Sequence, residues 1–303
     1  MVDFDLTYFL ILIAASVGFG VFGTIVGCLL AGAERVIAAK MEGRVGPPLL
    51  QPFYDVKKLL VKEKASINTS ERAYVAFGLI LAVIAGGIFF SGGNLLMCIF
   101  VITLSALMII LAAYSSRSPY SEAGAAREIL QVMSYEPMVL FFAVTLAVFA
   151  VTQGVGVAES MNISTFMNLG VPAIAACWIA FVGLVYVLTI KLRKSPFDLS
   201  SSHHAHQELV SGMTTEMSGR TLALLEITHW LETVLFLGWV ALFFVNSNPA
   251  SIAIAVVVAL VIWFLEIVID SNAARVKWQL MLFSAWAVAF ICGVANLFVL
   301  LVF

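Results

Sequence analysis

The sequence predicts an all-α membrane protein with eight transmembrane helices, and three observations support this prediction. The chain of 303 residues is 62% hydrophobic and only 11% charged, with a mean hydropathy of +1.06, which excludes a soluble globule. Its apolar runs are about 20 residues long, the length that a membrane-spanning helix needs. All 16 Lys and Arg residues fall into four segments, which alternate with segments that contain none.

The basic segments set the predicted orientation, because Lys and Arg accumulate in the cytoplasmic loops of membrane proteins. Both termini are therefore expected outside, in a single polytopic domain of the cell (cytoplasmic) membrane. Each span should be helical, because a bilayer interior offers backbone amides no other partner. The predicted large, structured cytoplasmic loops are residues 34–72, 115–128, 191–220 and 271–279.

The first three spans are predicted at residues 8–33, 73–91 and 95–114. The first follows Asp3 and Asp5 instead of a basic segment and is too long for a signal peptide, so it should remain in the membrane. The second and third are joined by a short connection without Lys or Arg, which places that connection outside.

The other five spans continue the same alternation to the end of the chain. Short connections without Lys or Arg follow the fourth and the sixth span, and basic segments follow the third, the fifth and the seventh. The predicted bounds are 129–152, 165–190, 221–245, 251–270 and 280–303.

The cysteines and histidines do not predict a catalytic, metal or cofactor site in this chain. The four cysteines lie singly in four different spans without a Cys-x-x-Cys pair, which argues against iron–sulfur ligation. His203, His204 and His206 lie too close together for a metal site on one regular element. They could titrate near neutral pH at a joint with a partner, or simply pack against it. The basic residues are interleaved with acidic ones, so nucleic acid is not an expected partner.

Acidic residues inside the predicted spans are the candidate proton pathway, because a charged side chain in a bilayer is costly and usually functional. Glu136 lies in the fourth span, and Glu266 lies four residues before Asp270 on one face of the seventh. In the sixth span Glu226, His229 and Glu232 are three residues apart and form a ladder along the helix.

An alternative remains open for these acids. They could pair with Arg127, Arg220 or Arg275 and simply hold helices together.

Three ordered motifs lie in the predicted cytoplasmic segments. The first consists of Glu34-Arg35, Gly46-Pro47, Leu49 to Asp55 (Leu-Leu-Gln-Pro-Phe-x-Asp) and Lys62-Glu63. The second runs from Gly124 to Glu136 as Gly-Ala-x-Arg-x-x-x-Gln-x-x-Ser-Tyr-Glu, and the third joins Pro196–Leu199 to Glu208–Gly212. Together they resemble the H subunit of bacterial complex I, its mitochondrial counterpart, and the corresponding membrane subunits of energy-converting hydrogenases.

Two departures favour one branch of this family. Only Pro48 separates Gly46-Pro47 from Leu49, where the respiratory subunits have a longer stretch. Residues 200–207 are rich in Ser and His, where those subunits carry an acidic loop of the quinone chamber. The chain therefore resembles more closely the membrane subunit of an Ech-type [NiFe] hydrogenase, which passes electrons from ferredoxin to protons and moves ions.

This resemblance implies partners and a junction. The expected partners are the soluble large and small [NiFe] hydrogenase subunits, an iron–sulfur subunit and an antiporter-like membrane subunit, with the [NiFe] centre and iron–sulfur clusters in those partners. Lys57, Lys58 and Lys194 are expected to face the soluble subunits. The junction residues are predicted to be Glu34, Arg35, Asp55, Arg127, Asp198, His203, His204, His206, Glu208 and Glu216.

Three alternatives stay open at this level. The acids of the junction could form ion pairs that only order the loops. The chain could be the quinone-site membrane subunit of respiratory complex I. A stand-alone ion transporter would also contain buried acids, but it would usually show internal repeats, and none is visible here. The transported ion, H⁺ or Na⁺, is not predicted.

Overall fold

The computed structural model describes residues 6–63, 69–194, 196–198, 200 and 209–302. Its regular elements are helices, and the described residues contain no β-strand, only two isolated bridges. The elements are α1 (Leu6–Met41), α2 (Gln51–Val61), α3 (Thr69–Phe90), α4 (Leu95–Ser115), α5 (Pro119–Thr152), α6 (Ile163–Asn168), α7 (Ile174–Lys191), the 3-10 helix η1 (Gly212–Thr214), α8 (Arg220–Leu242), α9 (Ala250–Asn272) and α10 (Trp278–Val302).

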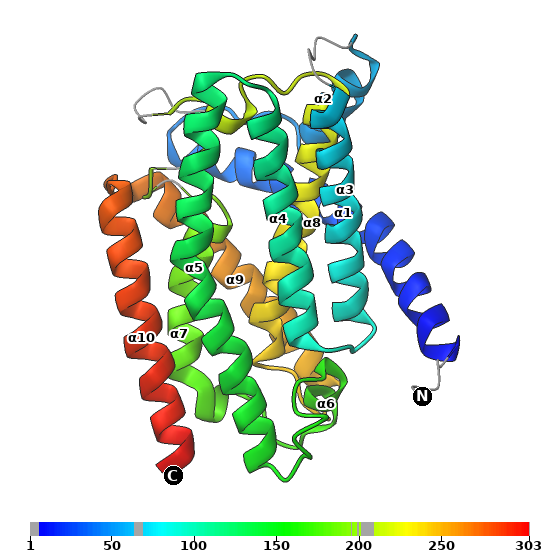
Figure 1. Cartoon of the computed structure of the whole chain (residues 1–303). Coiled ribbons are helices and arrows are strands. Elements are labelled where there is room, and N and C mark those ends of the chain that lie inside the picture. Colours follow the sequence, from blue (N-terminus) through cyan, green and yellow to red (C-terminus); the bar gives the residue numbers. More distant parts are fainter. Residues whose placement is uncertain (1–5, 64–68, 195, 199, 201–208, 303) are drawn as a thin grey trace.

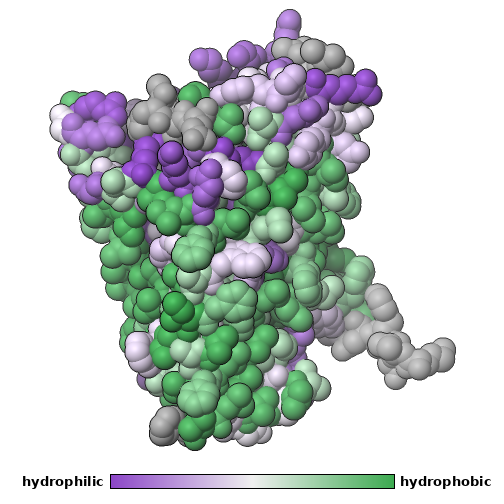
Figure 2. All heavy atoms as spheres, turned by 60° about the vertical axis from the view of Figure 1, so that its left-hand side comes forward, coloured by the Kyte–Doolittle hydropathy of each residue, from purple (hydrophilic) through white to green (hydrophobic). Residues whose placement is uncertain are grey.

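The predicted fold class is confirmed, because eight of these helices are long and apolar enough to cross a membrane. They stand side by side in one bundle, with the start of α1 and the end of α10 in the half of the molecule away from α2 (Figure 1). Hydrophilic residues gather at the end that carries α2, above an almost continuous hydrophobic surface (Figure 2). This end is called the polar end below.

Two helices extend beyond the spans predicted for them. α1 continues to Met41, past residue 33, because no Pro or Gly interrupts the strong helix formers that follow Ala33. α5 begins ten residues before residue 129, at Pro119, whose fixed φ suits the first turn of a helix. Glu34, Arg35 and Arg127 consequently lie on helices, although they were predicted in loops.

The predicted span 165–190 is divided. The short helix α6 ends at Asn168, and the long helix α7 begins only at Ile174. Gly170 and Pro172 lie between them, and proline disfavours a helical conformation in the residue before it. The membrane-crossing part of this segment is therefore α7.

Pro137 interrupts the hydrogen bonding of α5, and α10 repairs the interruption. Proline has no amide proton, so the carbonyl of Met133, four residues earlier, loses its helical donor. The indole Nε1 of Trp286 on α10 donates to this carbonyl at 2.9 Å. The break in α5 thereby becomes a point of attachment for α10.

A second break, in α7, is repaired by the same helix. Cys177 has φ −106° and ψ 24°, which kinks α7. Asn296 on α10 accepts from the amide of Ala180 at 3.1 Å and donates to the carbonyl of Ala176 at 3.3 Å. These two groups would pair with each other in a regular helix. α10 is therefore bound to both α5 and α7 through polar groups inside an apolar bundle.

Aromatic side chains fill the centre of the bundle. Phe142 of α5 lies 5.9 Å from Trp239 of α8 and 5.5 Å from Phe243, measured between ring centroids. Phe181 of α7 approaches Phe243 at 5.2 Å. Phe142, Trp239 and Phe243 are fully buried. This aromatic layer joins α5, α7 and α8, the three helices that carry the charged site.

Candidate functional site

Five ionisable residues from three helices and the turn after α7 come together inside the bundle. Glu128 and Glu136 come from α5, Glu232 from α8, Lys191 is the last residue of α7, and Arg193 follows it. Glu128, Lys191 and Glu232 are buried, and Glu136 and Arg193 are half-buried. These five residues are called the inner charge cluster.

Arg193 lies between two carboxylates of the cluster. Its Nη2 atom is 3.5 Å from Glu128 Oε1 and 3.8 Å from Glu232 Oε2. Burial acts to lower the pKa of Arg193, but the charges of Glu128 and Glu232 outweigh this and raise it. The guanidinium therefore stays charged over the whole physiological pH range.

The backbone at the end of α7 directs Arg193 into the cluster. Arg193 has φ +55°, a left-handed conformation that mostly glycine adopts at this position of a helix end. Its amide donates to the carbonyl of Ile190 at 3.0 Å, and that of Lys194 donates to Thr189 at 2.8 Å. These two bonds are those of a Schellman motif. An arginine at this position carries a backbone cost of about 1–2 kcal/mol.

Glu128 is held by Ser200 and Gln131. The Ser200 hydroxyl donates to Glu128 Oε2. With its amide oriented to satisfy both neighbours, Gln131 donates to the same oxygen at 3.2 Å and accepts from the Ser200 amide at 2.9 Å. Gln131 and Ser200 thus fix the carboxylate that faces Arg193.

Two glycines allow the chain around Ser200 to approach α5. A Cβ atom on Gly124 would lie 2.2 Å from the backbone nitrogen of Met213, and one on Gly212 would lie 2.1 Å from the carbonyl oxygen of Ser200. Both positions therefore require glycine. This contact brings Ser200 to Glu128 and explains the presence of both glycines in their motifs.

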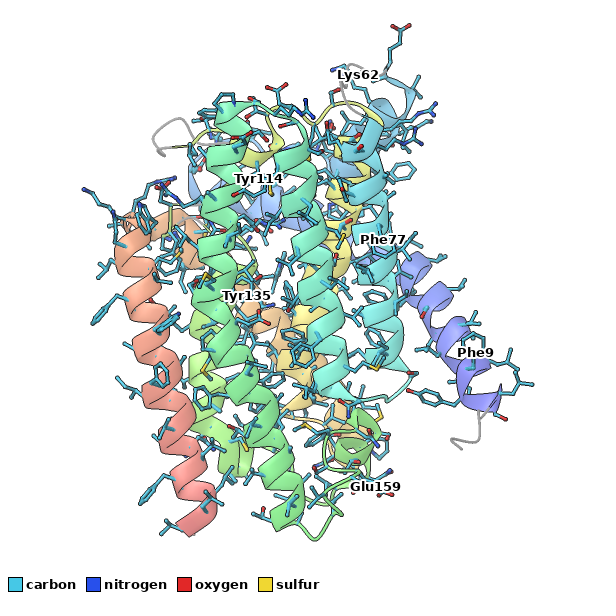
Figure 3. The ribbon with its side chains drawn as sticks, viewed as in Figure 1. Phe9, Lys62, Phe77, Tyr114, Tyr135 and Glu159 are labelled. Carbon is cyan, nitrogen blue, oxygen red and sulfur yellow. The ribbon has the colours of Figure 1, made fainter. Side chains whose placement is uncertain are left out.

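Lys191 is enclosed by aromatic rings. Its Nζ atom is 4.3 Å from the ring centroid of Tyr135, 4.4 Å from that of Phe236 and 4.9 Å from that of Trp239. The side chain is 8% exposed. Tyr135 lies about midway along α5 (Figure 3). These three rings are called the aromatic cage; they stabilise the ammonium by cation–π attraction.

Glu136 is the innermost acid on α5, beside the aromatic cage. Its Oε1 atom accepts a hydrogen bond from the Thr103 hydroxyl of α4 at 3.0 Å. Its Oε2 atom is buried and receives no hydrogen bond from the part of the chain that the structure describes. Glu136 and Glu232 are the carboxylates that act electrostatically on Lys191.

A small cavity of about 20 Å³ connects these groups. Glu128, Tyr135, Lys191, Arg193 and Glu232 are among its lining residues. A volume of this size accommodates about one water molecule, and the polar lining supplies its hydrogen-bond partners. The cavity can therefore hold a water between Glu128 of α5 and Glu232 of α8.

Further ion pairs lie between the cluster and the polar end. Lys194 pairs with Glu34 of α1, and Arg127 pairs with Asp198. Lys194 is 3% exposed. The expectation that Lys194 faces a soluble partner is therefore wrong, because its ammonium is buried against Glu34.

Arg35 and Asp55 connect α1 to α2. Arg35 Nη1 lies 2.7 Å from Asp55 Oδ2, and Gln51 donates to the other oxygen at 2.9 Å. Partial burial acts to raise the pKa of Asp55, but the hydrogen bonds from Arg35 and Gln51 outweigh it and lower the pKa. Five predicted junction residues thus form ion pairs within the chain.

The structure brings together some of the predicted proton-pathway residues and separates others. Glu136 and Glu232 belong to the inner charge cluster, and Glu226 acts electrostatically on Arg193. Glu266 is fully buried on α9; neither carboxylate oxygen has a hydrogen-bond partner among the described residues, and Lys194 and Asp270 act on it electrostatically. His229 is half-buried on α8.

The remaining predicted junction residues are placed only in part. Glu216 is half-buried after η1. His203, His204, His206 and Glu208 lie outside the described residues. Within the described ranges, no group of three His, Cys, Asp or Glu side chains could hold a metal ion.

Sequence reasoning missed Glu128, Lys191 and Arg193 as parts of the site. The three basic residues near the end of the fifth span were interpreted only as signals of topology and docking. Their position in the sequence contained a usable signal, because Lys191 directly follows Ile190 at the end of a predominantly apolar run. Glu128, Gln131 and Tyr135 also recur at helical spacing and share one face of α5.

The fold and the site define a polytopic membrane protein with a buried cluster of charged residues inside its helical bundle. Comparison with known proteins identifies the family. A profile described as NADH dehydrogenase matches residues 13–301, so the chain belongs to the NADH dehydrogenase family that includes the H subunit of complex I.

Individual relatives agree with this assignment. The H subunit of NADH-quinone oxidoreductase from Bacillus cereus (strain B4264) is 29% identical over 328 residues, covering 95% of this chain and 90% of the relative. The same protein of Bacillus thuringiensis (strain Al Hakam) matches to the same extent, 29% over 328 residues.

A solved structure shares the fold. A chain of the membrane-bound sulfane sulfur reductase, an archaeal respiratory membrane complex, superposes with a TM-score of 0.80 at 19% identity, covering 94% of this chain and 99% of that chain. This likeness shows that the chain has the same fold as that subunit.

Proposed function

We propose that this chain is the membrane-anchoring and ion-translocating subunit of a ferredoxin-dependent energy-converting [NiFe] hydrogenase. The complex would couple electron transfer from ferredoxin to protons, with reversible formation of H₂, to ion movement across the membrane. Its soluble large and small subunits, with an iron–sulfur subunit, would sit on the cytoplasmic polar end and carry the [NiFe] centre and iron–sulfur clusters. An antiporter-like subunit would lie beside it in the membrane.

The inner charge cluster is the observation that carries the ion-translocating role. It contains three carboxylates, Glu128, Glu136 and Glu232, and two basic groups, Lys191 and Arg193. With all five charged, one negative charge is left uncompensated in a buried site, which is costly. One proton bound by the cluster would cancel this charge. The cluster is thus suited to hold and release a single proton.

The arrangement also supplies a route for that proton. Glu128 and Glu232 face the same guanidinium, and both line the water-sized cavity. A proton can therefore pass between them through one water and the carboxyl groups. Two further ion pairs, Lys194 with Glu34 and Arg127 with Asp198, extend the series of charged groups toward the polar end. A redox reaction in the soluble subunits would change the local charge at that end.

The hydrogenase assignment rests on the sequence departures at Pro48 and at residues 200–207. The second candidate, a quinone-site subunit of respiratory complex I, is favoured by the names of the relatives at 29% identity. The two candidates differ in the electron acceptor and in the metal content of the partners. Purification of the native complex through a tag on this chain separates them.

The test measures both activities on that purified complex. We expect stoichiometric nickel in the partner subunits and H₂ evolution from reduced ferredoxin. Quinone reduction without nickel or H₂ evolution would instead assign the chain to respiratory complex I.

The ion-translocating role is tested with Glu136→Gln in the complex reconstituted into proteoliposomes. Gln preserves the shape and the bond from Thr103 but does not titrate, so the complex should assemble, with ion uptake reduced at least tenfold. Glu159→Gln is the matched control, because Glu159 is exposed at the end opposite to α2 (Figure 3). Normal ion uptake in assembled Glu136→Gln would contradict the proposal, and poor assembly would favour a structural role.

A further inference from the structure

The position of Lys191 bears on which ion the site can exchange. Its ammonium has left water, because the residue is 8% exposed, and the aromatic cage surrounds it with rings from α5 and α8. A desolvated cation beside aromatic faces is stabilised without a carboxylate in direct contact. The cage therefore holds the ammonium at this point of the bundle.

The cage is built so that the ammonium stays beside two acids. Glu232, Phe236 and Trp239 recur at spacings of four and three residues, which places them on one face of α8. On α5, Tyr135 directly precedes Glu136. The same two helices thus supply both the rings that hold the ammonium and the carboxylates whose charges act on it.

The other basic group of the cluster already has partners, because Arg193 lies between Glu128 and Glu232. From α4, the uncharged Thr103 donates a hydrogen bond to Glu136. Glu136 Oε2 is buried without a hydrogen bond from the described residues. Without the ammonium of Lys191, the inner charge cluster would contain three carboxylates and a single positive group, that of Arg193. Such a site would either bind protons or recruit another cation.

The cavity that Glu128 and Glu232 line is too small for such a cation while Lys191 is present. The cavity of about 20 Å³ accommodates roughly one water. A hard metal cation needs a shell of several oxygen ligands, and the ammonium and its three rings occupy the volume where that shell would form. A proton needs no such volume and can reside on a carboxyl group or on the water.

We infer that Lys191 is a tethered cation that occupies the place of a metal ion beside Glu136 and Glu232, so that the site exchanges H⁺ and excludes Na⁺. The inference rests on the proposed function for its physiological meaning, because it names the ion that the subunit moves. Lys191 acts as a specificity-determining residue: its ammonium occupies the space that a metal ion would need, and its positive charge offsets one of the carboxylates of the cluster.

The test measures cation binding to the full chain, purified in detergent, through its thermal unfolding in NaCl and in N-methylglucamine chloride at equal ionic strength. The wild type should show the same Tm in both salts. Lys191→Gln removes the ammonium and leaves room, so its Tm should rise with NaCl and saturate at a shift of roughly 2–4 °C. Lys191→Arg is the matched control that keeps the positive charge, and its Tm should not respond to Na⁺.

A double variant locates the site. Lys191→Gln combined with Glu136→Gln has the same net charge in the cluster as the wild type but lacks the free carboxylate, so the response to Na⁺ should disappear. A saturable Na⁺ response in the wild type, or its absence in folded Lys191→Gln, would overturn the inference. If Lys191→Gln cannot be purified, a Na⁺ response of the wild type or of the double variant overturns it equally.

The proposed function is judged by a separate measurement. An intact complex that moves no ion in proteoliposomes would overturn the proposed function while the Tm results stand. An active complex whose Lys191→Gln form shows no Na⁺ response would overturn only the inference.

Discussion

Arg193 combines an unfavourable backbone conformation with a favourable electrostatic environment. Its left-handed φ ends α7 and turns the guanidinium back toward Glu128 and Glu232. A glycine would adopt this conformation more easily but would leave both carboxylates without their cation. The arginine is therefore explained by the charge it places in the bundle, and the Schellman hydrogen bonds hold it there.

Two substitutions separate these effects. Arg193→Gln has the same backbone cost but leaves two buried carboxylates unpaired, so it should destabilise the protein by about 3–5 kcal/mol. Arg193→Gly should be less damaging by about 1 kcal/mol, because it relieves the left-handed strain. Thermal unfolding in detergent measures both.

The exposed pair of Arg44 with Glu42 supplies the control for these substitutions, and Arg44→Gln should change stability by less than about 1 kcal/mol. Equal stability of Arg193→Gln and the wild type would show that the buried ion pairs contribute nothing.

The identity of the acids could be predicted from the sequence, but their partners could not. A carboxylate in an apolar run, such as Glu136 or Glu232, is visible without a structure. Which cation reaches it depends on the turn after Lys191 and on the rotation of α5 and α8 about their axes. The structural alternative named Arg127, Arg220 or Arg275 as possible partners, whereas the observed partner of Glu232 is Arg193, and Arg127 pairs with Asp198.

At the scale of elements, the contact of η1 with α5 determines whether the cluster is complete. Gly124 allows the backbone around Met213 to touch α5, and this contact positions Ser200 on Glu128. A Cβ atom at residue 124 would occupy the space in which the backbone nitrogen of Met213 lies, so η1 can approach α5 this closely only if residue 124 is glycine.

Gly124→Val should therefore displace η1 and Ser200 from α5. We expect a loss of about 1–3 kcal/mol from the forced shift, together with increased hydrogen exchange at residues 209–217. Gly18→Ala is the control, because no heavy atom outside its own helix surroundings lies within 4 Å of a Cβ at Gly18. That change should preserve or increase stability. Unchanged exchange in Gly124→Val would contradict this account of the loop.

Helix positions were predictable where apolar length decides them and were missed where polar residues continue a helix. The ends of α1 and α5 at the polar end contain Glu, Arg and Lys, which a hydropathy criterion assigns to loops, yet these residues favour helix as much as apolar ones do. The break before α7 arises from Gly170 and Pro172 inside a hydrophobic stretch, where composition alone suggests continuity.

At the scale of the whole molecule, the helices arrange the charged groups asymmetrically. The polar end contains α2 with the Arg35–Asp55 pair, and the ion pairs of Glu34 and Arg127 lie between this end and the inner charge cluster. The rest of the surface visible in Figure 2 is mostly hydrophobic. Basic loops remain on the cytoplasmic side during membrane insertion. The polar end is therefore expected to face the cytoplasm.

Labelling of single cysteines tests this orientation. Lys57→Cys on α2 and Glu159→Cys near α6 place exposed thiols at opposite ends. A membrane-impermeant maleimide should label Glu159→Cys in right-side-out vesicles and Lys57→Cys in inside-out vesicles. The reverse pattern would place the polar end outside, and the positive-inside argument would then fail for this chain.

Pro137 gives α5 a mechanical property that follows from its place in the chain. The proline turn has one helical hydrogen bond fewer than the rest of α5, so it is the point at which this long rod bends most easily. Trp286 binds the carbonyl that Pro137 leaves without a helical donor. Glu136 sits at this point, whereas Glu128 and Arg127 lie two turns or more away, toward the polar end. We therefore expect α5 to bend at this point, so that a displacement at the polar end would move Glu128 relative to Arg193 by more than it moves Glu136.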